Sequence, residues 1–127
     1  MSPTRMSRLE SGMRIVLAFN DAFNRHDIAG MMQLISDNCV MESNSPAPGG
    51  TAYSGRQSIE QFYRDYFEKL PDVRSEIEDI FGFGYRCVMR WRYEWTDSAG
   101  KKEHIRGVDI FQIKDDLISE KLSYVKV

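Results

Sequence analysis

The spacing of apolar residues predicts helices in the first half of the chain. Apolar residues recur at helical spacing in residues 7–24, again in residues 28–35, and again from residue 58 to residue 67. Asp27 stands where the N-cap of the second helix is expected. The third helix must stop by Pro71, because proline is excluded from helix interiors. We therefore expect these helices to precede the main sheet.

A short strand and a loop are predicted between the second and third helices. Residues 39–42 are a short apolar segment typical of a strand. The sequence SNSPAPGGTAYSG follows, and its proline and glycine content argues against regular structure. We expect this loop to border a site.

Alternation of apolar and polar residues replaces the helical spacing from Val73 onward. It is clearest in residues 85–95, where Tyr, Cys, Met and Trp alternate with Arg, Val and Glu. Turns at residues 97–100 and 114–116 separate this strand from two more, and the whole predicts a meander of about four antiparallel strands. The returning strand covers residues 101–113, and the last one covers residues 117–127. Helices followed by consecutive strands indicate an α+β class.

Length and charge restrict the classes of partner. The 127 residues fit a single domain, residues 1–127. With 17 Lys and Arg against 19 Asp and Glu, the chain has no basic surface that would indicate nucleic acid. Its apolar runs are shorter than the roughly 20 residues that cross a membrane, and its polar N-terminus does not resemble a signal peptide. We expect a cytoplasmic protein with no nucleic-acid or membrane partner.

The cysteines and histidines do not indicate a metal site. Cys39 and Cys87 are expected to be free buried thiols, with a disulfide as the weaker alternative. His26 and His104 have no ligand at metal-binding spacing. We predict no structural metal and no cofactor.

Two stretches resemble a known family. Residues 26–63, HDIAGMMQLISDNCVMESNSPAPGGTAYSGRQSIEQFY, and the C-terminal VDIFQIKDDLISEKLSYVKV resemble the SnoaL-like and ketosteroid isomerase-like group of the nuclear transport factor 2-like superfamily. The resemblance implies a cystatin-like, cone-shaped α+β barrel, in which a curved antiparallel sheet wraps around N-terminal helices. It also implies an apolar pocket for a small organic molecule. The superfamily includes isomerases, cyclases, dehydratases and epoxide hydrolases, so the fold alone does not identify the reaction.

The resemblance to ketosteroid isomerases assigns roles to four positions. It places Asp109 at the neutral, hydrogen-bond-donating aspartate and Tyr63 at a tyrosine that supports the oxyanion hole. It places Phe19 at the tyrosine that donates to the oxyanion and Ser43 at the aspartate base. A phenyl ring has no proton to donate, and an ordinary hydroxyl cannot abstract a carbon-bound proton unaided. One carboxylate position of the limonene epoxide hydrolases is similarly held by Ser123.

Each candidate also has a structural interpretation. Asp109 could bond to the backbone or to Arg106, and Tyr63 or Trp91 could belong to the plain core. Glu42 could replace the missing base, although alternation turns it to the other face. We predict Asp109 and Tyr63 as catalytic, and the ligand-binding set as Phe19, Ser43, Phe62, Met89, Trp91, Phe111 and Ser123.

Three functions follow from these residues. The first is binding of a polyketide-like, steroid-like or terpenoid compound with isomerisation, cyclisation or dehydration. The second is ligand binding or an accessory role without catalysis, and the third is a dimerisation domain whose pocket is filled by side chains. Val88, Val108 and Ile110 are expected to point away from the helices, which predicts a homodimer through the outer sheet face.

Overall fold

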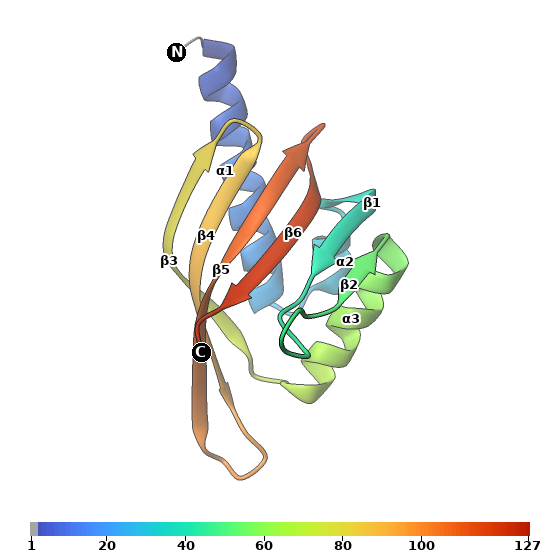
Figure 1. The fold of residues 1–127 in the computed structure, drawn as a ribbon, viewed down its shortest axis with the longest axis vertical. Coiled ribbons are helices and arrows are strands. Elements are labelled where there is room, and N and C mark those ends of the chain that lie inside the picture. The colour runs from blue at the N-terminus through green and yellow to red at the C-terminus, as the bar shows by residue number, and fades with distance from the viewer. Residues whose placement is uncertain (1–2) are drawn as a thin grey trace.

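The computed structural model describes residues 3–127, and the side chains of residues 11–127. Within that range the chain forms helices and strands in an α+β arrangement (Figure 1). The elements are α1 (Pro3–Asn24), α2 (Ile28–Met32), β1 (Ile35–Glu42), β2 (Ala52–Ser54), α3 (Arg56–Lys69), β3 (Arg74–Phe83), β4 (Arg86–Thr96), β5 (Lys102–Lys114) and β6 (Leu117–Val125).

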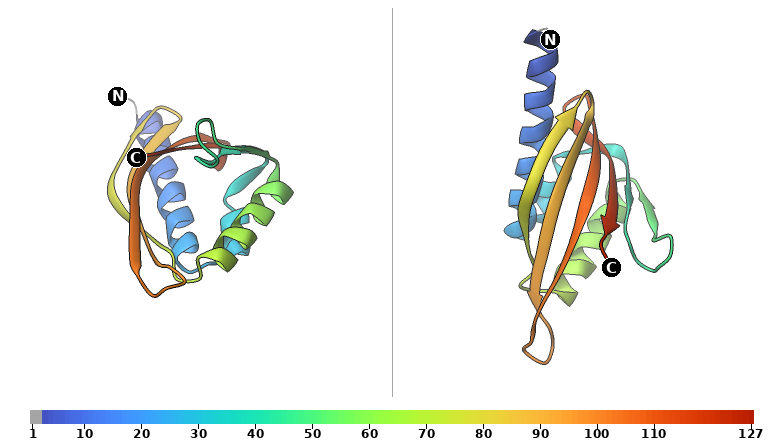
Figure 2. Two further views of the ribbon diagram at one scale, coloured as in Figure 1. Left: turned by 60° about the horizontal axis from the view of Figure 1, so that its bottom comes forward. Right: turned by 60° about the vertical axis from the view of Figure 1, so that its left-hand side comes forward.

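The strands form one curved sheet in the order β2-β1-β6-β5-β4-β3. The sheet bends around the helices, with α1 and α3 on its concave side (Figure 2). This confirms the expected α+β class and the curved sheet. The sheet stays open, with β2 and β3 at its edges, and one pair departs from the antiparallel prediction because β1 runs parallel to β6.

Helix α1 packs its apolar side against the sheet and is also fixed by polar contacts. Val16, Phe19, Ala22 and Phe23 are buried. Asn24 closes a double contact with the backbone of Ser75 in β3, accepting from its N–H at 2.7 Å and donating to its carbonyl at 3.0 Å. These bonds set the position of α1 along the sheet.

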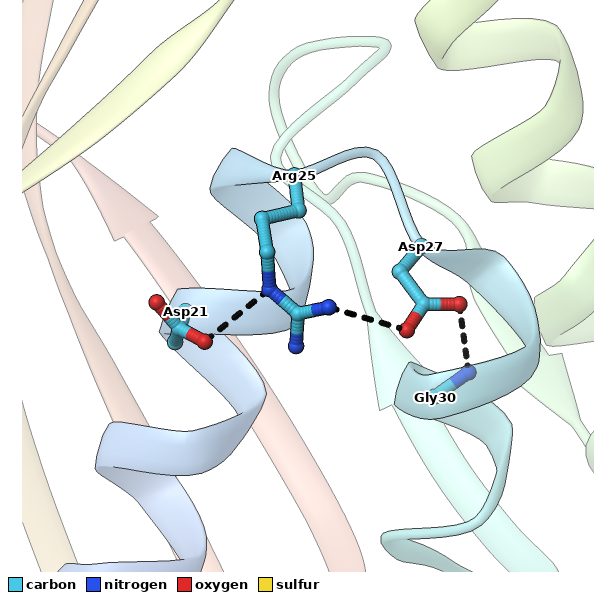
Figure 3. Close-up of polar contacts among 4 residues, drawn as sticks. All are labelled: Asp21, Arg25, Asp27 and Gly30. Carbon is cyan, nitrogen blue, oxygen red and sulfur yellow. Dashed lines mark hydrogen bonds and ion pairs between the residues drawn. The ribbon is translucent and has the colours of Figure 1, made fainter.

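The turn between α1 and α2 is organised by carboxylates (Figure 3). Arg25 bridges Asp21 at 3.0 Å and Asp27 at 3.3 Å. The other oxygen of Asp27 accepts a hydrogen bond of 3.0 Å from the Gly30 N–H, which satisfies a free donor at the start of α2. The predicted N-cap is confirmed.

The second helix is shorter than its apolar pattern predicts. It ends at Met32, and residue Ile35 already begins β1. Ile35 lies opposite Ile118 of β6, whose N–H donates to the carbonyl of Leu34 at 2.9 Å. Pairing with a distant strand therefore outweighs the helical periodicity of residues 33–35, and the first strand starts before residue 39.

The proline- and glycine-rich segment is only partly irregular. Residues Ala52–Ser54 form β2 and pair with β1, so the prediction of an unstructured loop is wrong for them. The loop before β2 is closed by a bond of 2.9 Å from the Ser43 N–H to the Thr51 carbonyl. Gly50 has φ of +76°, and a Cβ there would collide with the Ser43 carbonyl, so this turn needs glycine.

The long strands show the alternation expected from the sequence. On β4, Cys87, Met89 and Trp91 are buried on the concave face. On the convex face, Val88 lies opposite both Phe81 of β3 and Ile110 of β5, and Ile110 lies opposite Leu122 of β6. These four residues form an apolar row across the convex face. Among the described residues, no helix combines the length and apolarity that crossing a membrane requires.

Candidate functional site

The predicted site residues come from strands and helices that meet on the concave face of the sheet. Each is buried or half-buried. They are Phe19 on α1, Ser43 directly after β1, Phe62 and Tyr63 on α3, Met89 and Trp91 on β4, Asp109 and Phe111 on β5, and Ser123 on β6.

A small internal cavity gathers part of this set. Its volume is about 40 Å³, and the predicted residues among its lining are Ser43, Phe62, Tyr63, Trp91 and Ser123. The rest of the lining is Phe23, Met41, Asn44, Tyr66, Tyr93, Ile105 and Lys121. Ligand pockets usually enclose about 300–1,000 Å³, whereas one water needs only about 10–15 Å³. The cavity can therefore hold a small polar group but not a whole organic molecule.

Four predicted residues lie in the packed core and do not line this cavity. They are Phe19, Met89, Asp109 and Phe111. Phe19 illustrates the packing, since its ring makes edge contacts with Tyr63 at 6.0 Å and with Phe111 at 6.3 Å between centroids. These residues support the cavity wall from behind.

A larger groove lies beside the cavity. It has a volume of about 900 Å³ and runs along α3, β2 and residues 43–45. The groove and the cavity share four lining residues, Ser43, Asn44, Phe62 and Tyr66. The two spaces thus share a wall, and the groove is large enough for the body of a small organic molecule.

A buried polar cluster forms the sheet side of the cavity. The Ser123 hydroxyl donates to Asp109 Oδ1 at 2.7 Å. Lys121 Nζ donates to Ser123 Oγ at 3.2 Å and lies 3.4 Å from Asp109 Oδ2, and it interacts electrostatically with the Tyr63 phenol. The Asp109 side chain is 1% exposed and that of Lys121 is 10% exposed. Lys121 and Asp109 therefore form an ion pair inside the protein.

The electrostatics of the cluster keep Lys121 charged. Burial by itself would lower the pKa of the ammonium group, but the charge of Asp109 and the contact with Tyr63 hold that pKa above its ordinary value. Burial raises the pKa of the Tyr63 phenol, and it raises that of Tyr93 strongly. At neutral pH the cavity wall thus presents an ammonium group and neutral phenols.

Asp109 does not stand alone as the sequence predicted. Both of its oxygens face donors, namely the Ser123 hydroxyl and the Lys121 ammonium group. The expectation of an unpaired Asp109 is therefore wrong, whereas its catalytic role stays a prediction. The expected alternative partner, Arg106, pairs instead with Glu78 at 2.9 Å.

Trp91 carries an unsatisfied donor at the cavity. Its side chain is 2% exposed, and its indole Nε1 has no hydrogen-bond partner among the described residues. The ring is held against Gly107 of β5, where a Cβ would approach the Trp91 ring to 2.6 Å. A buried donor without an acceptor costs about 1–3 kcal/mol.

Comparisons with known proteins agree with this architecture. The model of the SnoaL-like domain family matches residues 16–121, which is most of the chain. The chain belongs to the SnoaL-like domain family. No curated protein matches it.

Solved structures extend the likeness of this SnoaL-like domain. An NTF2-like protein of unknown function from Mesorhizobium loti is 36% identical, with 94% of each chain covered and a TM-score of 0.80. A putative polyketide cyclase from Xanthomonas campestris is 19% identical, with 94% of this chain and 93% of that one covered and a TM-score of 0.80. TerC, co-crystallised with polyporic acid, is 18% identical, with 91% and 92% covered and a TM-score of 0.79.

Two of the predicted site residues, Phe19 and Ser43, offer no free acid or base to the cavity. Phe19 places a phenyl ring in the core. The Ser43 hydroxyl borders the cavity, but its single O–H is within donating distance of the backbone carbonyls of Ser45, at 3.1 Å, and Thr51, at 3.4 Å. It is therefore part of the loop structure rather than a free base. Glu42 does not line the cavity either.

Lys121 is the charged residue among the lining residues that the sequence reasoning missed. It lies two positions before Ser123 on β6, and alternation places residues i and i+2 of a strand on the same face. Ser123 was already expected to face the pocket, so its strand partner carried the same signal. A lysine in a strand suggests a solvated face, and for that reason the signal was overlooked.

The histidines lie outside the cavity. His26 stacks on Phe67 with centroids 4.1 Å apart, and its Nε2 contacts the Val73 carbonyl at 3.0 Å. In the part of the chain that the structure describes, no group of three His, Cys, Asp or Glu side chains is arranged to hold a metal. Both cysteines are buried and free, as expected.

Proposed function

We propose that this SnoaL-like domain binds a small, mostly apolar organic molecule, with its body in the groove and one polar group in the cavity. The observation that carries the proposal is the shared wall between a groove of about 900 Å³ and a cavity lined by a buried ammonium group and aromatic rings. The groove wall mixes polar side chains with the apolar surfaces of Tyr53, Phe62, Tyr66 and Leu70, and a concave site of this size is typical of small-molecule binding.

The structural relatives support an oxygen-bearing cyclic compound as the ligand class. One relative is described as a putative polyketide cyclase, and TerC was crystallised with polyporic acid. For this chain we propose a polyketide-like, steroid-like or terpenoid compound. The groove lining contains the aromatic side chains of Tyr53, Phe62 and Tyr66, which favour planar ring systems.

Conversion of the ligand is proposed to use the polar cluster. Tyr63 and Lys121 both line the cavity and can hydrogen-bond a ligand oxygen, stabilising negative charge that develops there. Asp109 does not reach the cavity, so its proposed role is to hold Lys121 charged and in position. Isomerisation, cyclisation and dehydration of carbonyl compounds through an enolate develop such an oxygen-centred charge.

A second candidate function is ligand binding without conversion. It is favoured by a specific observation, namely that Phe19 and the loop-bonded Ser43 provide neither a donor nor a base at the positions where the isomerases have them. In that case the pocket is retained and the chemistry is lost.

The test is a panel of cyclic ketones, lactones and epoxides. Binding is measured by ligand-observed NMR, and conversion is followed by mass spectrometry. We expect several members to bind the wild type and the Leu17→Ala control, whose residue is exposed on α1, and to bind Phe62→Ala weakly. Conversion supports the enzyme, whereas binding alone supports the accessory role. A protein that binds no member of the panel contradicts both.

We also propose a homodimer through the convex face of the sheet. Support comes from the apolar row of Phe81, Val88, Ile110 and Leu122, of which Phe81 is 54% exposed. A twofold contact would bury this row from both copies. The net charge of -2 offers no support for nucleic acid as a partner.

A further inference from the structure

We propose that the groove binds a neutral, hydroxyl-rich ring, such as a sugar, which the ligand carries beside its apolar body. This inference rests on the proposed small-molecule site and adds the chemical class of one part of the ligand. It concerns the groove and not the cavity. It follows from the arrangement of polar and aromatic side chains along α3, β2 and residues 43–45.

Helix α3 presents two parallel rows of side chains to the groove. The outer row is Gln57, Gln61, Asp65 and Lys69, and the inner row is Ser58, Phe62, Tyr66 and Leu70. Residues four positions apart are neighbours on a helix surface, so each row follows the helix. The outer row is exposed and the inner row is half-buried, which makes the first a polar rim and the second a floor. Since each residue rises about 1.5 Å, the rim extends for about 18 Å, which is enough for more than one ring.

The floor of the groove is aromatic. The rings of Tyr53 on β2 and Phe62 on α3 have centroids 4.9 Å apart, and the rings of Phe62 and Tyr66 are stacked at 5.7 Å. All three side chains are half-buried and line the groove, so each contributes part of its ring surface to it. The C–H faces of a sugar ring can pack on such a surface while its hydroxyl groups point to the edges.

The rim offers donors and acceptors side by side. A side-chain amide carries both, which matches a hydroxyl group that donates and accepts at once. Gln57 and Gln61 bring amides from α3, and Asn44 brings one from the loop side of the groove. Gln61 Nε2 donates to Asp65 Oδ1 at 2.9 Å, which orients this pair and leaves the amide oxygen and the second carboxylate oxygen as acceptors. Among the described residues, none hydrogen-bonds the amides of Asn44 and Gln57.

The charges of the groove favour an uncharged partner. Its lining includes the carboxylates of Glu60 and Asp65, and Lys69 is the one basic side chain among the lining residues. A phosphate or carboxylate on the ligand would meet more negative than positive charge there, whereas hydroxyl groups meet no such repulsion. Uncharged hydroxyls are therefore the polar groups that this rim fits best.

The test compares phenyl glycosides with 2-phenoxytetrahydropyran, which has the same phenyl ether of a pyran ring but no hydroxyl groups. The glycosides are phenyl β-D-glucoside, β-D-galactoside, β-D-xyloside and α-D-mannoside, and dissociation constants are measured by NMR titration. We expect at least one glycoside to bind about 5-fold or more tightly than the ether. The reason is that each hydrogen bond to the rim should contribute about 2- to 10-fold.

Variants of the rim and floor locate the contact. Gln57→Met and Gln61→Met remove an amide and keep an unbranched side chain, so each should weaken the preferred glycoside by about 2- to 10-fold and leave the ether unchanged. Both side chains are exposed, so the variants should fold, which circular dichroism checks. Tyr53→Ala removes part of the floor and should weaken both compounds. The control Glu68→Ala changes an exposed residue of α3 outside the groove and should affect neither.

The outcomes separate this inference from the proposed function. If the ether binds and no glycoside binds more tightly, or if the Gln57 and Gln61 variants bind the glycoside as the wild type does, the hydroxyl-rich ring is ruled out and the small-molecule site stands. If neither the glycosides nor the ether bind but members of the ketone, lactone and epoxide panel do, the result is the same. If nothing in either set binds, both proposals are wrong.

Discussion

The buried pair of Asp109 and Lys121 makes a strong prediction about stability. Asp109→Asn keeps the shape of the side chain but leaves the Lys121 ammonium group, 10% exposed, without its counter-charge. Removing one partner of a buried ion pair costs about 3–5 kcal/mol. The free energy of unfolding of natural domains is roughly 5–15 kcal/mol, so the variant should lose a large share of its stability. With an unfolding entropy of about 2.1 cal/mol/K per residue, its Tm should fall by about 10–20 °C.

The coupling between the two residues is measured by a double-mutant cycle in urea at neutral pH. Lys121→Met should be destabilised by a similar amount, because it leaves the Asp109 carboxylate unpaired. The double variant Asp109→Asn/Lys121→Met should be more stable than either single variant, since replacing a whole buried pair is often neutral. The matched control is the surface pair Arg86 and Glu120, with side chains 47% and 33% exposed, where coupling should stay below about 1 kcal/mol.

The pH dependence gives the sign of the same effect. Folding raises the pKa of Lys121, so the charged ammonium group adds to the free energy of unfolding. This added stability is complete below the unfolded pKa of about 10.4 and is lost as pH rises through the folded pKa. The stability difference between wild type and Lys121→Met should therefore shrink only above about pH 10. Additive single-variant effects, with coupling within about 0.5 kcal/mol of zero, would refute the ion-pair interpretation.

Three other predictions follow from separate features. Burial raises the pKa of Cys39 and Cys87 from 9.0 to about 11, so the stability that these thiols add is complete below pH 9 and lost as pH rises toward 11. Replacing both cysteines with Ala should make the free energy of unfolding, measured with urea, depend less on pH over that interval. A pH dependence that is the same as in the wild type would contradict the prediction. Gly107→Ala should lower the free energy of unfolding by about 1–3 kcal/mol in thermal denaturation, because the new Cβ would meet ring atoms of Trp91 at 2.6 Å. Gly12→Ala in α1, where the nearest contact of the new Cβ is at 3.5 Å, should raise the free energy of unfolding by up to about 1 kcal/mol. Ile110→Lys should turn a dimer into a monomer in analytical ultracentrifugation, and a wild type that already sediments as a monomer refutes the proposed interface.

Sequence patterns predicted the parts of the fold that depend on local spacing. The alternation on β4 correctly separated the buried Cys87, Met89 and Trp91 from the opposite face, because an antiparallel sheet with one covered face enforces a period of two. The start of β1 at Ile35 was not predicted, since it depends on parallel pairing with Ile118, far along the chain. Short β2 was missed for the same reason.

The candidate site was predicted in its residues more than in its chemistry. Alternation and the family resemblance brought Tyr63, Trp91 and Ser123 to one cavity. The partner of Asp109 was missed, because a sequence gives no distance between Lys121 and a carboxylate on the neighbouring strand. The size of the cavity depends on how aromatic rings pack, which residue spacing does not encode.

The charge pair and the groove belong to different parts of the architecture. Asp109 and Lys121 sit on the adjacent central strands β5 and β6, whereas the groove is built by α3, β2 and residues 43–45 at the β2 edge of the sheet. Substitutions in that outer wall can reshape the space offered to a ligand without disturbing the ion pair. The fold therefore separates the residues that shape the groove from the residues that set the interior charge and the stability that depends on it.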